Sequence, residues 1–198
     1  LHDALPISIS KGSWDSEIDY ALIENGFVGI LVDTNVNANP TLRISNTMIR
    51  NQSHVGLMGQ TAHIVGQNLL VSNCGTATVV MQYGGHYDYS HCTFANYWRY
   101  ETRKYPSVII TNYYDYQGTL YLYPMQASIT DCIIYGSRAD GELLIDLDDR
   151  VDASATVTHS IVRGGEWDED PMFVNPQGGD FHLQEGSPAV GIGYSYPN

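Results

Sequence analysis

A six-residue unit recurs along the chain, and a repeat of this kind constrains the fold more than any single residue does. The copies begin at residues 20, 46, 68, 91, 131 and 159, and they read YALIEN, NTMIRN, NLLVSN, HCTFAN, DCIIYG and HSIVRG. Successive starts are therefore 26, 22, 23, 40 and 28 residues apart. The shortest spacings define one coil of a solenoid, and the longer spacings carry insertions.

Each copy has the alternation of a β-strand, because its second and fourth positions share one face. The fourth position is apolar in every copy: Ile23, Ile49, Val71, Phe94, Ile134 and Val162. Further apolar runs follow at 29–32, 56–58, 78–81, 108–110 and 143–145, and helical periodicity is absent. Stacked coils about 4.8 Å apart would bury one column of side chains. The sequence therefore predicts an all-β, right-handed parallel β-helix of about six rungs with a long loop insertion.

Polar residues mark the turns between these strands. The sixth position carries Asn25, Asn51, Asn73 and Asn96, and we expect a structural ladder in which amide groups pass hydrogen bonds from rung to rung.

From the second copy onward, the first position of the unit carries an amide, carboxylate or imidazole side chain: Asn46, Asn68, His91, Asp131 and His159. We interpret it as a turn position that requires a side-chain hydrogen bond. Together with His91 and His159, histidines 54, 63 and 86 are the alternative candidates for metal ligands. The repeat favours the turn interpretation, so the sequence predicts no metal site.

Charge and cysteine content exclude several functions. There are 22 acidic and 9 basic residues and a formal net charge of −13, which disfavours binding to nucleic acid or anionic lipid. No apolar run approaches the roughly 20 residues of a membrane span. Cys74, Cys92 and Cys132 are too few for a disulfide framework and lack the paired spacing of a zinc site, so we expect buried, small apolar side chains.

The rungs, and above all residues 91–98 (HCTFANYW), resemble bacterial right-handed parallel β-helix repeat-containing proteins of the pectate-lyase-like superfamily. Residues 170–176 (DPMFVNP), 179–183 (GDFHL) and 186–189 (GSPA) are similar to the C-terminal closing segment of that group. The resemblance covers residues 13 to 193 and implies a secreted or cell-surface protein. It implies a fold more than a chemistry, since the superfamily contains lyases, hydrolases, epimerases and non-catalytic proteins.

The chain divides into three parts on this interpretation. Residues 1–8 read as the translation of a sequencing adapter, residues 9–193 as the β-helix with a C-terminal cap from about 165, and residues 194–198 as a tail. A reading frame truncated upstream would hide any signal peptide. It would also leave an open strand edge at the first rung, which favours self-association.

The 40-residue spacing holds the candidate carbohydrate-binding residues. Aromatic faces stack on sugar rings, and nearby Arg103 and Lys104 could meet an acidic polysaccharide. The alternative is that these rings pack back over the solenoid wall. The candidates are Tyr97, Trp98, Arg99, Tyr100, Tyr113, Tyr114 and Tyr116.

Asp146 and Asp148 are the candidate catalytic residues. Paired carboxylates can act as acid and base in glycoside hydrolysis or can bind Ca²⁺, which is the one candidate cofactor. The alternative is a solvated acidic edge. The sequence as a whole predicts a scaffold fragment that binds polysaccharide, against two alternatives: a polysaccharide lyase or glycoside hydrolase with its catalytic rungs upstream, and a non-catalytic adhesin or spacer.

Overall fold

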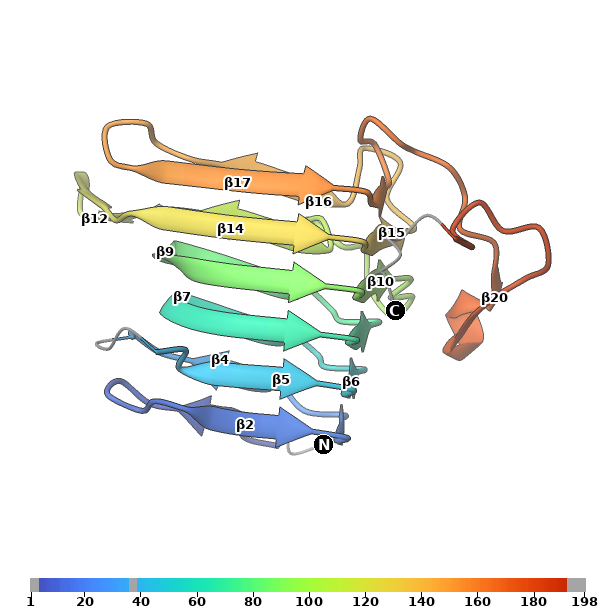
Figure 1. Ribbon diagram of the computed structural model, residues 1–198, viewed down its shortest axis with the longest axis horizontal. Helices are drawn as coiled ribbons and strands as arrows, with labels where there is room; N and C mark the ends of the chain where they lie inside the picture. The colour runs from blue at the N-terminus through green and yellow to red at the C-terminus, as the bar shows by residue number, and fades with distance from the viewer. Residues whose placement is uncertain (1–3, 36–38, 192–198) are drawn as a thin grey trace.

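The computed structural model describes residues 4–35 and 39–191, and there the chain forms a parallel β-solenoid of about six coils (Figure 1). Each coil contributes a strand to each of three walls. The fold class predicted from the repeat is confirmed. Among the described residues, no helix is long and apolar enough to cross a membrane.

The first wall is the row of long parallel strands at the front of Figure 1. The sequence did not predict it. It consists of β2 (Ser16–Asp19), β5 (Leu42–Ser45), the second half of β7 (Val55–Gln67), the second half of β9 (Ala77–Ser90), β14 (Met125–Thr130) and β17 (Ala153–Thr158).

The second wall is built from the six repeat units. Its strands are β3 (Leu22–Glu24), β6 (Met48–Arg50), β8 (Leu70–Ser72), β10 (Thr93–Asn96), β15 (Ile133–Gly136) and β18 (Ile161–Val162).

The third wall contains the apolar runs that follow each unit. Its strands are β1 (Ile7–Ile9), β4 (Val28–Val32), the first halves of β7 and β9, β11 (Val108–Thr111) and β16 (Leu143–Asp146). β7 and β9 therefore run through two walls, with a register shift between Gln60 and Ala62 at the bend.

The core is the predicted interior file. Ile49, Val71, Phe94 and Ile134 are successive register partners in the second wall, and all four are 0% exposed. The three cysteines are free and buried, as the sequence predicted. One continuous apolar column thus runs through the coils, which is what lets a stack of short strands be stable.

The first position of each unit is a left-handed turn, as predicted. In all six copies this residue has a φ between 47° and 56°, a region that Asn and Asp tolerate best. The side-chain ladder also lies here: Asn68 Nδ2 donates to Asn46 Oδ1 (2.8 Å), and Asn46 Nδ2 donates to Asp19 Oδ1 (2.8 Å).

The four asparagines of the sixth position behave differently from one another. Asn25, Asn51 and Asn73 are left-handed, with φ of 63°, 56° and 52°. Asn96 is buried, and its amide bonds the peptide of Cys74, donating to Cys74 O (2.8 Å) and accepting from Cys74 N (3.1 Å). The side-chain hydrogen bonds of Asn73 and Asn96 go to backbone groups, so these two amides do not bond each other.

The C-terminal segment lies on the flank of the solenoid. It contains β19 (Phe173–Asn175), the 3-10 helix η1 (Pro176–Gly178) and β20 (Asp180–Leu183), and Figure 1 shows it beside the second wall. Phe173 packs with Ala95, Tyr135 and Ile161 on the outer face of that wall. The expected cap therefore covers a side of the solenoid more than its end.

The structure describes only part of the two terminal segments, residues 1–8 and 194–198, that are predicted to lie outside the β-helix. Strand β1 includes Ile7 and Ser8, from the segment interpreted as adapter-derived, and pairs them with Ile30 and Leu31 of β4. Residues 1–3 and the predicted tail at 194–198 lie outside the described residues.

Candidate functional site

The predicted aromatic residues fall into two separate groups. Residues 97–100 lie in the loop between β10 and β11. Tyr113, Tyr114 and Tyr116 lie in β12 (Tyr113–Tyr116), which forms a hairpin with β13 (Thr119–Leu122). Figure 1 shows β12 near the start of β14 and β10 beyond its end, so the candidate carbohydrate-binding residues form two separate surfaces. The strand β11 separates the two insertions, and each leaves the solenoid at a different corner.

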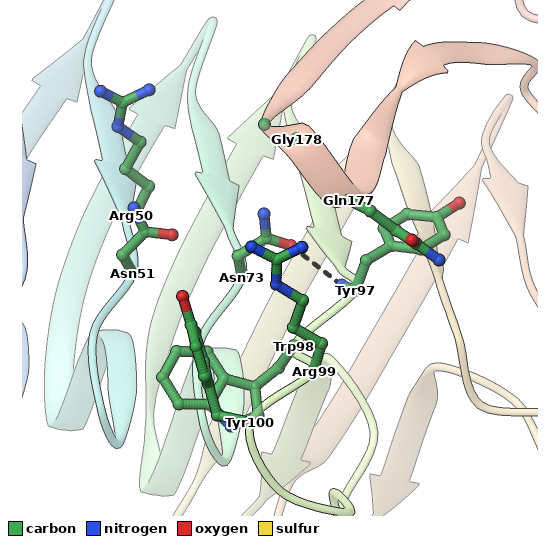
Figure 2. A pocket seen from close by; sticks show the side chains of 10 residues that line it. Arg50, Asn51, Asn73, Tyr97, Trp98, Arg99, Tyr100, Gln177 and Gly178 are labelled. Atoms are coloured by element: carbon green, nitrogen blue, oxygen red, sulfur yellow. Dashed lines mark hydrogen bonds between the residues drawn. The ribbon is translucent and has the colours of Figure 1, made fainter.

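The first group lines a pocket of about 170 Å³ between the β10–β11 loop and the C-terminal segment (Figure 2). Four parts of the chain meet there: the end of β6, the end of β8, the β10–β11 loop, and η1. The lining residues are Arg50, Asn51, Asn73, Tyr97, Trp98, Arg99, Tyr100, Gln177, Gly178 and Gly179.

Hydrogen bonds through Asn73 hold the pocket together. Its Oδ1 accepts from Tyr97 N (3.0 Å), and its Nδ2 donates to Pro176 O (3.3 Å). One amide therefore joins the loop to the C-terminal segment. The aromatic ring of Tyr97 packs against Phe173 and Phe181, with centroids 6.4 and 6.3 Å away, which fixes the base of the loop.

The open side of the pocket is aromatic and cationic. Figure 2 shows Trp98 and Tyr100 lying together on one side of the pocket, with the Arg99 side chain extending toward Asn73. The Trp98 and Tyr100 ring centroids are 4.9 Å apart at 68°, and Arg99 Cζ lies 5.7 Å from the Tyr100 centroid. Tyr100 is 72% exposed, so its ring is available to a ligand.

A buried ion pair anchors the same loop. Arg103 Nη2 lies 2.5 Å from Glu142 Oε1, with the two side chains 2% and 0% exposed. Arg103 Nη2 also donates to Asn96 O (2.9 Å). The expectation that Arg103 belongs to a basic surface cluster for an acidic ligand is therefore wrong, because its charge is buried and neutralised.

The second group forms an exposed tyrosine platform on the β12–β13 hairpin. The Tyr114 ring lies 6.1 Å from Tyr116 and 5.9 Å from Tyr121, with interplanar angles of 25° and 30°. Tyr83 of β9 contacts Tyr114 edge-on at 5.3 Å. Tyr113 points its hydroxyl at Asp146, and this hydrogen bond raises the pKa of Tyr113.

The candidate carboxylates are both engaged by neighbours. Asp148 accepts from Arg150 Nε (2.8 Å) and Nη2 (2.6 Å), and this pairing lowers the pKa of Asp148 to about 2. Asp146 accepts the Tyr113 hydroxyl. A glycosidase pair requires one carboxyl group that keeps its proton near neutral pH. Asp148 is unsuited to that role, because Arg150 holds it in the ionised form.

The sequence missed the pocket residues that come from other coils. Asn51 and Asn73 occupy the same repeat position one coil apart, and Tyr97 follows that position in the next coil. The repeat register could have placed these three side by side. Gln177 could not have been found this way, because it lies outside the repeat.

No family model, curated protein or solved structure matches this chain. The function is therefore inferred from the residues of the site.

Proposed function

We propose that this protein is a non-catalytic β-solenoid that binds polysaccharide, with the pocket beside η1 holding one sugar residue. The observation that carries the proposal is a concave site in which the exposed Tyr100 ring, the Arg99 guanidinium and the Asn51 amide converge. Sugar rings stack on aromatic faces, while amide and guanidinium groups bond their hydroxyls.

The charges of the site favour a particular class of polysaccharide. Arg99 can pair with a sugar carboxylate, whereas Arg50 already pairs with Glu24 (2.7 Å). The net charge of −13 repels a uniformly anionic chain at long range. A polysaccharide with widely spaced acidic sugars satisfies both conditions, and it is our proposed ligand class.

The proposal places the protein outside the cell, secreted or at the cell surface, because such polysaccharides are met there. The solenoid acts as the scaffold that holds the β10–β11 loop against the C-terminal segment. The tyrosine platform on the β12–β13 hairpin is a separate aromatic surface that could contact another part of the same long chain.

A glycan-array screen followed by calorimetric titration of the best oligosaccharide tests the proposal. We expect Tyr100→Ala and Arg99→Ala each to weaken binding by about tenfold, since lost stacking or a lost charge-assisted bond costs about 1–2 kcal/mol. Tyr105→Ala is the matched control, because Tyr105 is 52% exposed in the same loop but does not line the pocket.

Three outcomes would contradict the proposal. Equal losses in the Tyr100 and Tyr105 variants would remove the pocket from the binding site. Release of new reducing ends from the bound oligosaccharide would favour the hydrolase or lyase alternative, and Asp146→Asn would then be the first variant. Absence of binding to every glycan would favour the adhesin or spacer alternative.

A further inference from the structure

Two histidines and an aspartate gather on the outer face of the first wall, away from the pocket. His63 of β7 and His86 of β9 are direct register partners, so their side chains share one face on adjacent strands. Asp88 lies two residues beyond His86 on β9, which returns it to the same face. The strand register alone therefore brings the three side chains together.

The geometry of these three side chains is that of a near-formed ligand set. The imidazole centroids of His63 and His86 are 4.6 Å apart at 34°, and His86 Nε2 lies 3.0 Å from Asp88 Oδ2. One ligand atom from each residue lies within 4.8 Å of the other two, and all three residues are half-buried. Among the described residues, this is the one group of three or more such side chains that comes so close together.

We propose that His63, His86 and Asp88 bind a divalent transition-metal ion, with Zn²⁺ as the best fit. Zinc takes imidazole nitrogen and carboxylate oxygen at about 2.0–2.2 Å, which places its ligand atoms about 3.3 Å apart. Small side-chain rotations bring the three atoms to that separation. Ca²⁺ and Mg²⁺ fit less well, because they prefer all-oxygen sites.

A hollow of about 510 Å³ beside the histidines gives room for the remaining ligands. Gln126, the register partner of His86 on β14, lines this hollow together with Asp152 and Asn35. The amide oxygen of Gln126 or a water molecule can therefore complete the coordination. Three protein ligands with an open fourth position are the arrangement in which zinc can also bind an outside molecule.

The local environment favours the protonation state that a metal requires. Burial, and after it the neighbouring His86, lowers the pKa of His63 and so favours its neutral form. A neutral imidazole offers a free lone pair. The metal would replace the present hydrogen bond between His86 and Asp88.

Calorimetric titration of zinc chloride into the EDTA-treated, dialysed protein tests the site. We expect one saturable equivalent of Zn²⁺, and an affinity about tenfold or more weaker in His63→Ala and His86→Ala, since each removes a direct ligand. His182→Ala is the matched control. His182 forms the same kind of pair with Asp180 two residues away (2.6 Å), but it is outside the three-residue group. The control variant should bind zinc like the wild type.

Two further readouts separate ligation from a structural effect. Zinc should raise the Tm of the wild type and of His182→Ala but not of His63→Ala, and His63→Gln provides a second variant that keeps a polar side chain. Bound Co²⁺ should give the visible spectrum of a nitrogen- and oxygen-ligated ion in the wild type. The His63→Ala variant should not give this spectrum. No saturable binding, or equal zinc affinity in the wild type and both histidine variants, would overturn the proposal.

Discussion

Arg103 and Glu142 form a buried, two-pronged ion pair between residues 39 positions apart in the sequence, with Nη1–Oε2 and Nη2–Oε1 distances of 3.0 and 2.5 Å. The Glu142 carboxylate also accepts from Ser107 N (2.8 Å), Ser107 Oγ (2.7 Å) and Arg138 N (3.0 Å). Each carboxylate oxygen is thus satisfied without water. The pair fixes the end of the loop that carries the pocket residues Trp98 to Tyr100.

Removing one partner of this pair should destabilise the fold strongly. We expect Arg103→Met to lower the free energy of unfolding by about 3–5 kcal/mol, because it leaves the Glu142 carboxylate buried without its counter-charge. Urea denaturation measures the change. Arg150→Ala breaks the exposed pair with Asp148 and should leave the urea midpoint close to that of the wild type. Similar midpoints for the two variants would contradict the structural role of Arg103.

The interior file makes a second prediction about stability. Ile134 is 0% exposed between Phe94 and Val162, so we expect Ile134→Ala to lower the free energy of unfolding by about 2–5 kcal/mol. Ile145→Ala is the control, because Ile145 is 42% exposed on a third-wall strand, and it should cost at most about 1 kcal/mol. Thermal and urea unfolding of the two variants check the difference. A larger loss of unfolding free energy in Ile145→Ala than in Ile134→Ala would contradict the assignment of the core to the interior file.

The buried thiol of Cys74 should make stability depend on alkaline pH. Burial raises the pKa of Cys74 to about 12, whereas an unfolded cysteine titrates near 8.5. Above about 8.5 the unfolded state loses a proton that the native state keeps, so this thiol reduces stability by about 1.4 kcal/mol per pH unit up to its native pKa. Urea midpoints at about pH 8 and about pH 11 measure the loss.

Cys74→Ser provides the comparison, because a hydroxyl group does not titrate in this range and can still donate to Ser72 O, as the thiol does (3.4 Å). The variant should lose less stability between the two pH values than the wild type. An identical loss in both proteins would show that Cys74 does not contribute to the alkaline transition.

We expect self-association at the first coil. Among the described residues, β1, β2 and β3 each pair with a strand on one side only, and an open strand edge invites a second chain. Sedimentation velocity should show a coefficient that rises with protein concentration. Ile7→Lys, which places a charge on the exposed edge strand, should reduce that rise. A single monomeric species at all concentrations would contradict this prediction.

The sequence predicted two of the three walls because their strands are rich in apolar residues at the repeat spacing. The strands of the first wall were not predicted, because their inward residues, such as Ile18 and Ile44, alternate with charged or polar ones. In addition, β7 and β9 continue from the third wall into the first without a break. Burial of Arg103 could not be predicted either, since its partner Glu142 lies far away in the sequence.

The two candidate sites differ in how far the sequence could lead to them. Residues 97–100 were candidates because of their aromatic side chains and their place in the 40-residue spacing, but the Gln177 side of the pocket depends on where the C-terminal segment docks. His63 and His86 are 23 residues apart, the same spacing as the repeat starts at 68 and 91. That spacing indicates register partners, so the signal for this pair was present in the sequence.

The most direct test of the proposed function is a crystal structure with the best-binding oligosaccharide. We predict one sugar ring stacked on Tyr100 in the pocket beside η1, with a sugar oxygen or carboxylate on Arg99. A ligand found on the tyrosine platform of the β12–β13 hairpin, with the pocket beside η1 empty, would contradict the account.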